Sequence, residues 1–435
     1  MLSGDFIREN VARVVATTRA KGKNVDVDAF LALDDRRRAL QRTVDDLRAA
    51  QNAASAAIAG ADDATRATLI AQMQDVKARL KDAQEELRSV QEKWRTVLHS
   101  IPNVVDPQMP RGGGEEDNVV VRTWGTKPQF DFTPKEHWEL GTALGVLDTE
   151  KAAEVSGARF WYLKGDLVLL QFALHQFAFA TLTDEAVIAR VAQDAGLDGI
   201  ATTPFVPMLP PVMVRRDVQH AIHRVFGDQT YAIEGEDLNL VASAEHTLAP
   251  YHMNETLDAA DLPKRYIGYS TAFRREAGTY GKDMKGFLRG HQFDKSEMES
   301  FTLPEDGARE QQLIVALQEY MVQQLGLHYR VVDICTGDAG GPDYRQFDIE
   351  TWLPGQDAYR ETHTSDYMTD YQTRGIKTYG RRADGSRALL HTNDATAFAG
   401  RTLIAIMEQY QQVDGSITVP DVLRRYMMRD VVGKV

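Results

Sequence analysis

Cysteine is almost absent from this sequence. Cys335 is the only cysteine in 435 residues, so no internal disulfide can form, which is typical of the reducing cytoplasm. Long apolar runs are also missing: the most apolar stretch, residues 167–182, contains Gln171, His175 and Gln176 and is too short and too polar to cross a bilayer comfortably. The first ten residues carry charges, and no uninterrupted apolar run ending in a small-residue cleavage site follows, so no export is expected. We therefore predict a cytoplasmic protein with no membrane partner and with an inert core thiol at Cys335.

Several nucleotide-binding and metal-binding motifs are missing as well. No GxGxxG, GxxxxGK[ST] or CxxC pattern occurs, so Rossmann, P-loop and zinc-knuckle sites lack their usual signals. A net positive charge is missing: 50 Lys and Arg stand against 63 Asp and Glu, and the resulting net charge of −13 argues against indiscriminate binding of nucleic acid, so no DNA partner is expected. Residues 1–100 are relatively basic, with 17 Lys and Arg against 15 Asp and Glu. Any nucleic-acid contact is therefore expected to be local.

The N-terminal part of the chain has the pattern of a helical hairpin. From Leu69 to Val97, apolar residues recur at alternating spacings of four and three, which is the seam of a heptad repeat. Residues 33–58 keep a looser version of the same period, and the turn-forming residues 59–63 separate the two stretches. Two long helices with a short connection are expected to fold back as an antiparallel coiled coil.

The function of this hairpin has two interpretations. Heptad repeats are most often structural, which favours a dimerisation or spacer coiled coil. Alternatively, cations of the second helix contact phosphates of a nucleic acid. The cations are Lys77, Arg79, Lys81, Arg88, Lys93 and Arg95. Scattered charges also occur on any solvated helix face, so the pattern alone leaves both interpretations open.

Prolines and glycines mark a domain boundary after the hairpin. The stretch at 101–117 contains Pro102, Pro107, Pro110 and three consecutive glycines, which do not continue a helix. The length of the chain allows two or three domains. We predict an N-terminal domain at 1–100 with its hairpin at about 27–100, a linker at 101–117 and a second domain at 118–435.

The second domain mixes strand-like and helical patterns irregularly, which predicts an α+β fold with a mainly antiparallel sheet flanked by helices. The patterns are a β-branched run at 119–121, a helix at 135–147, a buried helix after Lys164, an extended proline-marked stretch at 204–214, and a closing helix at 401–412.

The stretch from Tyr266 to Glu299 gathers candidate functional residues. It reads as a strand, a loop rich in glycine and charge, and a returning strand. Period-two alternation places Arg274 and Glu276 on one face of the first strand. On the second strand, one face holds His291, Phe293, Lys295 and Glu297. Such a face could hold a phosphate, a base edge and a polar side chain, although alternation alone favours a solvated face.

The same stretch resembles motif 2 of the class II aminoacyl-tRNA synthetases. Residues 273–276 form its F-R-x-E pattern, and residues 291–298 read HQFDKSEM, as in the serine-specific members of the class. Further stretches are similar to other parts of that family: 204–214 to the motif 1 dimer strand, 231–245 to the serine-binding loop, and 347–354 and 399–411 to the motif 3 region. The chain thus resembles a bacterial-type seryl-tRNA synthetase over essentially residues 1–430.

This resemblance implies residue roles. For ATP it implies Arg274 on the α-phosphate, Glu276 on the adenine amino group, Arg289 on the γ-phosphate, Phe293 and Arg401 on the two faces of adenine, and Glu350 on Mg²⁺ and ATP. For L-serine it implies Ser243, Glu245 on the ammonium group, Arg274, and Glu297 on the hydroxyl group. Arg274, Arg289 and Arg401 would stabilise the transition state, and no protein nucleophile is needed. His291 is then expected to be a hydrogen bonder of the sheet.

Several positions depart from the family pattern. Ser243 stands where Thr is usual, and Tyr367 and Gly375 replace the usual Asn and Arg. In motif 3, Asn393 falls where the family has asparagine, but Ala395 occupies the place of the serine-contacting Thr or Ser. A one-residue slip would bring the adjacent Thr396 into that place. Asn393 and Thr396 are therefore the serine-contacting candidates of this region.

The resemblance implies a homodimer held by residues 204–214 that adenylates serine and transfers it to tRNA(Ser), with tRNA(Sec) as a further candidate. Lys77, Arg79, Lys81 and Arg88 are the predicted tRNA contacts. One alternative is a synthetase-like paralogue that loads a carrier protein, but such relatives lack the hairpin. The other is a non-catalytic coiled-coil scaffold. The residues that argue against it are the intact Arg274, Glu276, Arg289, Glu350 and Arg401.

Overall fold

The structure, a computed structural model, describes residues 1–223, 227–277 and 285–435. These residues form two compact units, one of residues 2–104 and one of residues 105–435 with Met1. Residues 278–284 of the predicted motif 2 loop, which include Gly278, lie outside the described residues.

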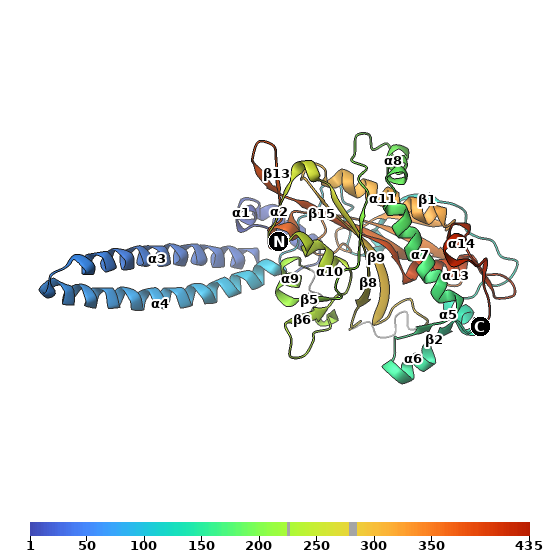
Figure 1. The fold of residues 1–435 in the computed structure, drawn as a ribbon, viewed down its shortest axis with the longest axis horizontal. Helices are drawn as coiled ribbons and strands as arrows, with labels where there is room; N and C mark the ends of the chain where they lie inside the picture. The colour runs from blue at the N-terminus through green and yellow to red at the C-terminus, as the bar shows by residue number, and fades with distance from the viewer. Residues whose placement is uncertain (224–226, 278–284) are drawn as a thin grey trace. The chain divides into compact units, whose positions relative to one another are not determined.

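The unit of residues 2–104 is built on two long helices, α3 (Val27–Gly60) and α4 (Asp63–Ser100), as Figure 1 shows. Each begins with an aspartate cap: the carboxylate of Asp26 accepts the backbone N–H of Ala29, and that of Asp62 accepts the backbone N–H of Thr65. The apolar seam between the helices consists of Leu40, Val44, Leu47, Leu80, Ala83 and Leu87, with Val76 and Val90 packed against it. The predicted antiparallel coiled coil is confirmed.

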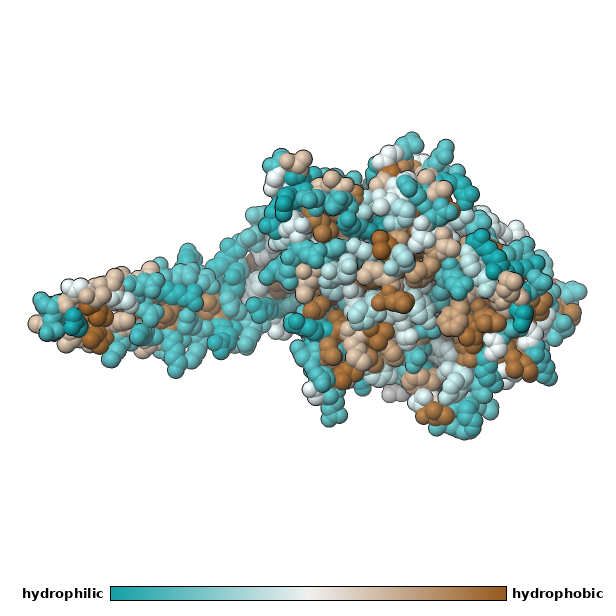
Figure 2. All heavy atoms as spheres, viewed as in Figure 1, coloured by the Kyte–Doolittle hydropathy of each residue, from teal (hydrophilic) through white to brown (hydrophobic). Residues whose placement is uncertain are grey.

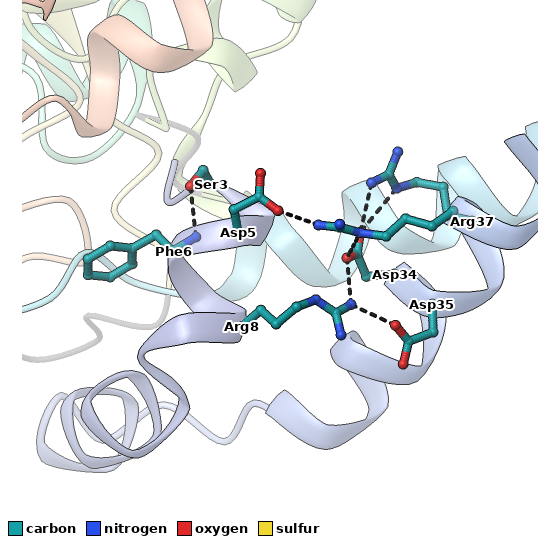
Figure 3. A network of polar contacts seen from close by, with 8 residues as sticks. Ser3, Asp5, Phe6, Arg8, Asp34, Asp35 and Arg37 are labelled. Atoms are coloured by element: carbon teal, nitrogen blue, oxygen red, sulfur yellow. Dashed lines mark hydrogen bonds and ion pairs between the residues drawn. The ribbon is translucent and has the colours of Figure 1, made fainter. Parts of the chain in front are cut away.

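Two short helices, α1 (Gly4–Glu9) and α2 (Val11–Ala20), precede the hairpin, and a buried aspartate ties α1 to its base (Figure 3). The side chain of Asp34 is 0% exposed and accepts hydrogen bonds from Arg8, Arg37 and Arg38 at 2.8, 2.8 and 2.7 Å. Burial raises the pKa of Asp34, but these three guanidinium groups outweigh burial and lower the pKa to about 2. The base of the hairpin is therefore held by an ionic network.

The hairpin is polar away from its seam. On the face drawn in Figure 2 its surface is mostly hydrophilic, with apolar groups gathered near the tip, a part of the chain in which Ile70 is 42% exposed. A narrow apolar stripe between two charged outer faces is what an exposed two-helix coiled coil requires.

The unit of residues 105–435 is organised around a sheet that, in the described residues, has eight strands in the order β1, β10, β11, β12, β15, β9, β8, β4. In that order they span Val119–Trp124, Tyr329–Asp333, Arg345–Leu353, Ala358–Thr369, His391–Ala399, Gln292–Thr302, Lys264–Phe273 and Val206–Met208. Neighbouring strands are antiparallel except β4, which runs parallel to β8. The predicted α+β fold with a mainly antiparallel sheet is confirmed.

Helices flank this sheet and short ladders extend it (Figure 1). The helices are α5 (His137–Leu144), α6 (Thr149–Ser156), α7 (Asp166–Leu182), α8 (Glu185–Asp194), α9 (Arg216–Ala221), α10 (Glu245–Leu248), α11 (Gly307–Gln324), α12 (Tyr371–Ile376), α13 (Gly400–Gln409) and α14 (Asp421–Met427). The short strands are β2 (Leu147–Asp148), β3 (Tyr162–Leu163), β5 (Met213–Arg215), β6 (Leu238–Leu240), β7 (Thr256–Asp258), β13 (Tyr379–Arg381), β14 (Arg387–Leu389), β16 (Ile417–Thr418) and β17 (Val431–Val432).

One face of the main sheet carries the apolar core. Ile267 of β8, Met298 of β9, Ala395 of β15 and Ile349 of β11 belong to one buried cluster with the apolar residues of α7, α11 and α13. Because side chains alternate along a strand, the neighbouring residues point to the opposite face. That opposite face is polar and holds the candidate site.

Two predicted boundaries are corrected. The first strand of the motif 2 hairpin ends at Phe273, so Arg274 and Glu276 follow the strand rather than belong to it. The predicted closing helix ends at Gln409, and the further helix α14 follows it.

Among the described residues, no single helix is long and apolar enough to cross a membrane. The pair α7 and α8, bent by 78°, meets the criteria of length and composition only when its two helices are taken together.

Candidate active site

A cavity of about 370 Å³ opens on the polar face of the sheet. Most of the residues predicted to bind ATP and serine meet there. Ser243, Glu245, Arg274, Glu276, Arg289, Phe293, Thr396 and Arg401 line it. These residues come from separate parts of the chain, which the sheet brings together.

Arg274 lies at the centre of this group, directly after β8. Its Nε donates to the carbonyl oxygen of Ala242 at 3.3 Å, and its guanidinium lies 5.1 Å from the centre of the Phe293 ring. The ring Nδ1 of His291 donates to the backbone carbonyl of Arg274 at 3.0 Å. Burial lowers the pKa of Arg274, and Glu361 acts against that shift. A guanidinium fixed in this way is ready to receive an anion.

Glu276 and Arg289 form an ion pair at the side of the cavity. The distance from Nη1 of Arg289 to Oε2 of Glu276 is 3.0 Å. Strand alternation does not explain the position of Glu276, because it follows the end of β8 and has a φ of 50°, in the left-handed region. Nε of Arg289 is buried and has no hydrogen-bond partner within residues 1–223, 227–277 and 285–435.

The carboxylate beside Arg274 and Arg401 is Glu361, which no sequence pattern indicated. Nη1 of Arg401, in the first turn of α13, donates to Oε2 of Glu361 at 3.1 Å and to its carbonyl oxygen at 3.0 Å. Burial raises the pKa of Glu361, but Arg401 and Arg274 outweigh burial and bring the pKa below its usual value.

The predicted position of Glu350 in this cavity is wrong. Glu350 is the direct cross-strand neighbour of Glu361 but lines a separate cavity and is ion-paired with Arg330 of β10. Directly paired residues of adjacent strands share a face, so the two carboxylates lie side by side and only one reaches the arginines. The sequence could not distinguish them, because both end up on the same face of neighbouring strands.

Lys295 of β9 lines the cavity and forms a buried ion pair with Glu297 of the same strand, which is not among the lining residues; their side chains are 9% and 0% exposed. The alternative of a solvated sheet face is therefore wrong for these residues. The hydroxyl of Ser243 donates to Oε2 of Glu297 at 3.0 Å. In the described part of the chain, Oε1 of Glu297 has no hydrogen-bond partner. Burial raises the pKa of Glu297, and Lys295 acts against that shift.

Glu245 is the second buried carboxylate of the site, at 3% exposure, and it begins the short helix α10. The side-chain amide of Gln372 in α12 donates to Oε1 of Glu245 at 2.7 Å. The carbonyl oxygen of that amide accepts the hydroxyl of Thr392 at 2.9 Å. Sequence patterns gave no signal for Gln372 or Thr392, because their role depends on contacts between distant elements.

The prediction for Asn393 has to be corrected. On β15, Thr396 is paired with Glu297, and Asn393 is paired with Ser300. Thr396 lines the cavity, whereas the side-chain amide of Asn393 donates to the carbonyl oxygen of Gly307 at 3.1 Å. Asn393 therefore faces α11 on the other side of the sheet. Asp394, next to it, lines the cavity, as does Asp366 on β12.

Two departures from the family pattern have local packing reasons. The Tyr367 ring covers Gly307, where an added Cβ would lie 2.6 Å from the ring, and its hydroxyl is 2.6 Å from Nδ1 of His391. Gly375 lies against α9, and a Cβ there would come within 1.9 Å of the carbonyl oxygen of Ala221. A longer side chain at Gly375, which belongs to α12, would push α12 away from α9.

The predicted tRNA contacts lie on α4. Lys77, Arg79, Lys81 and Arg88 are exposed. Arg79 is 3.6 Å from Asp75 and Lys81 is 3.9 Å from Glu85, so these two cations are paired one turn along the helix. Such exposed pairs are weak and do not prevent contact with a phosphate.

Comparisons with known proteins agree with this arrangement. A family model described as the tRNA synthetase class II core domain (G, H, P, S and T) matches residues 230–410, and one described as the seryl-tRNA synthetase N-terminal domain matches residues 1–105. Serine–tRNA ligases from Clavibacter michiganensis subsp. michiganensis and Geobacter sulfurreducens are each 39% identical, over 98% of this chain and 96% and 98% of their own lengths. The crystal structure of seryl-tRNA synthetase from Pyrococcus horikoshii complexed with ATP superposes with a TM-score of 0.84 at 34% identity, covering 100% of both chains.

The antiparallel sheet with arginines and carboxylates on its polar face, together with the matched core, defines a class II aminoacyl-tRNA synthetase fold. Within that class, the N-terminal hairpin and the similarity over nearly the whole chain decide which family the chain belongs to. The chain belongs to the seryl-tRNA synthetase family.

Proposed function

We propose that this chain activates L-serine with ATP and transfers the seryl group to the 3′ end of tRNA(Ser). The observation that carries the proposal is the buried carboxylate Glu297, whose Oε1 has no partner among the described residues, beside a second buried carboxylate, Glu245. An amino acid supplies an ammonium group for Glu245, and serine adds a hydroxyl for Glu297. Alanine leaves that oxygen desolvated and unpaired, so its rejection should be strong.

Adenylation then needs positioning and charge rather than a protein nucleophile. A carboxylate oxygen of serine attacks the α-phosphorus of ATP, the bond to the bridging oxygen breaks, and pyrophosphate leaves. Arg274 neutralises the α-phosphate, and Arg289 reaches the γ-phosphate after leaving Glu276. Glu276 is then available to the adenine amino group, and Phe293 and Arg401 take the two faces of the base. In the second step the terminal ribose hydroxyl of tRNA attacks the seryl carbonyl carbon, and AMP leaves.

Mg²⁺ belongs to the proposal as a companion of ATP. Within the described residues, no group of three or more His, Cys, Asp or Glu residues could hold a metal ion. One carboxylate completed by substrate phosphates is a common magnesium site, and Glu361 beside Arg274 and Arg401 fits that pattern better than Glu350. The ion would neutralise charge on the phosphates of ATP.

The two units take different roles in this proposal. The N-terminal domain, residues 1–100, contacts tRNA through Lys77, Arg79, Lys81 and Arg88, and residues 118–435 hold the catalytic domain. A homodimer is proposed through residues 204–214, where Val206, Leu209 and Met213 are 54%, 82% and 47% exposed. Exposed apolar residues gathered within one short segment favour a partner surface, and a two-fold dimer is the commonest assembly. Cytoplasmic localisation completes the proposal.

Pyrophosphate exchange with each of the twenty amino acids tests the first step, and charging of tRNA(Ser) and tRNA(Sec) transcripts tests the second. We expect exchange with serine alone, followed by transfer to tRNA(Ser). Exchange without transfer to any tRNA would favour the carrier-protein paralogue. No exchange with any amino acid would favour the scaffold.

A further inference from the structure

A second cavity, of about 380 Å³, adjoins the proposed ATP and serine site. The two cavities share Trp161, Phe287, Phe293 and Gly400 in their walls. The remaining wall comes from α6, from residues 160–163, from α7 and from the start of β9. The adenylation step uses this second cavity only at the shared ring of Phe293, which is proposed to stack on adenine.

The walls of this cavity are aromatic. Phe160, Trp161, Tyr162, Phe172 and Phe293 all line it. Tyr162 and Phe172 remain 43% and 48% exposed, although both are large rings at the mouth of a hollow. Exposed apolar groups that gather around a hollow mark a ligand or partner site.

The polar groups of the cavity suit a neutral ligand with hydrogen-bonding edges. Gln292 is exposed, whereas Gln171 donates to Oδ2 of Asp294 at 2.8 Å and Thr271 donates to Oδ1 of the same carboxylate at 2.7 Å. Asp294 is the one charged residue among the described residues that line the cavity, which disfavours a phosphate inside it. Arg159 and Lys164 flank the aromatic run in the sequence. Arg159 donates to the carbonyl oxygen of Glu276 at 3.2 Å and Lys164 lies 3.5 Å from Asp148, and a nucleic-acid backbone outside the cavity would compete for these cations.

We propose that this cavity receives an unstacked base from the single-stranded 3′ end of tRNA, next to the terminal adenosine. Aromatic faces that stack bases and an amide that bonds to their edges are the usual means of holding single-stranded RNA. The inference rests on the proposed function, because the terminal adenosine has to reach the seryl-adenylate in the first cavity. Its neighbouring nucleotide then reaches the second cavity at Trp161 and at the face of Phe293 that is not proposed to stack on adenine.

The test uses the full-length enzyme and tRNA(Ser) transcripts that carry fluorescent 2-aminopurine at the penultimate position. The variant is Phe172→Ala, and the matched control is Leu169→Ala, which is 43% exposed on the same helix and does not line the cavity. We expect 2-aminopurine to be quenched by the parent and by the control but much less by Phe172→Ala. Transfer from preformed seryl-adenylate should slow about tenfold or more in Phe172→Ala, while serine-dependent pyrophosphate exchange stays unchanged.

A second pair of variants separates stacking from misfolding. Tyr162→Ala should behave like Phe172→Ala, and Tyr162→Phe, which keeps the ring, should behave like the parent. Quenching and transfer at the parent's level in both alanine variants would overturn the proposal. Absence of serine-dependent exchange in the parent would instead reject the proposed function, and this inference with it.

Discussion

Gln372 donates its side-chain amide to Oε1 of Glu245 at 2.7 Å, from a different element of the fold. The hydroxyl of Thr392 donates to the carbonyl oxygen of that amide at 2.9 Å. Because the carbonyl oxygen is engaged by a donor, the amide is oriented with its N–H groups toward Glu245. This contact holds Glu245 as a hydrogen-bond acceptor at the position proposed for the serine ammonium group.

Replacing Gln372 by Met should weaken serine binding without affecting ATP. The substitution keeps the length of the side chain but removes a hydrogen bond to a charged group, worth about 1.5–3 kcal/mol. We expect the KM for serine in pyrophosphate exchange to rise about tenfold or more and the KM for ATP to stay within twofold.

Two controls define this effect. Thr392→Ser keeps the hydroxyl that orients the amide and should resemble the parent. Inhibition by 3-hydroxypropionate, which has the hydroxyl and carboxylate of serine but no donor at the position of the ammonium group, should be equal in parent and Gln372→Met. Equal weakening of serine and 3-hydroxypropionate would mean that Gln372 supports the whole pocket rather than Glu245.

Arg274→Ala should abolish adenylation and leave the fold intact. Losing a preorganised charge at the α-phosphate costs about 3 kcal/mol or more in the transition state, which is about a hundredfold or more in rate. The neighbouring Arg275→Ala is the control, because Arg275 is exposed and its backbone N–H, which bonds to Gln229, is unchanged. Pyrophosphate exchange by Arg274→Ala within tenfold of the parent would refute its role.

The sequence predicts those parts of the molecule that depend on local periodicity. The hairpin follows from its heptad spacing, because each apolar residue of the seam is placed by neighbours three or four positions away. The faces of β9 follow from alternation, and Phe293, Lys295 and Glu297 are found together. Such patterns need no knowledge of distant elements.

The sequence-based predictions of site residues fail where the register of a strand shifts, and where two neighbouring strands each offer a carboxylate for the same role. The register of β15 shifts between Thr396 and Phe398, so counting back from Arg401 misplaces Asn393 by one residue. The pairing of β11 with β12 also shifts register next to Glu350, at the place where the prediction took Glu350 instead of Glu361. A single extra residue in a strand moves the following side chains to the other face, and no sequence pattern announces it.

Asp34→Asn should loosen the base of the hairpin. It removes the charge that Arg8 and Arg37 (Figure 3) share with Arg38, a loss of about 2 kcal/mol at neutral pH. The folded pKa of about 2 lies below the usual 3.8, so the stabilisation is present above about pH 4 and is lost as the pH falls toward 2. The difference between variant and parent should shrink over that range.

Amide hydrogen exchange in α1 measures this effect locally. Exchange should be faster in Asp34→Asn at pH 7, and the control Asp35→Asn should change little, because Asp35 is 67% exposed although it lies 2.8 Å from Arg8. Equal exchange rates in both variants would show that the buried network does not hold α1.

The last prediction concerns the exposed cations of α4. Replacing Lys77, Arg79, Lys81 and Arg88 together by Gln should leave serine-dependent pyrophosphate exchange unchanged, because the proposed ATP and serine site is built entirely from residues 105–435. Affinity for tRNA(Ser) should fall, and the dependence of log Kd on log salt should become shallower by about one unit for each phosphate that the variant no longer neutralises. The control is Arg42→Gln with Arg48→Gln on α3, two cations that are also exposed. A variant that charges tRNA with the parent's KM and salt dependence would make the hairpin a spacer, and an equal fall in affinity in the control would mean that the RNA binds both helices.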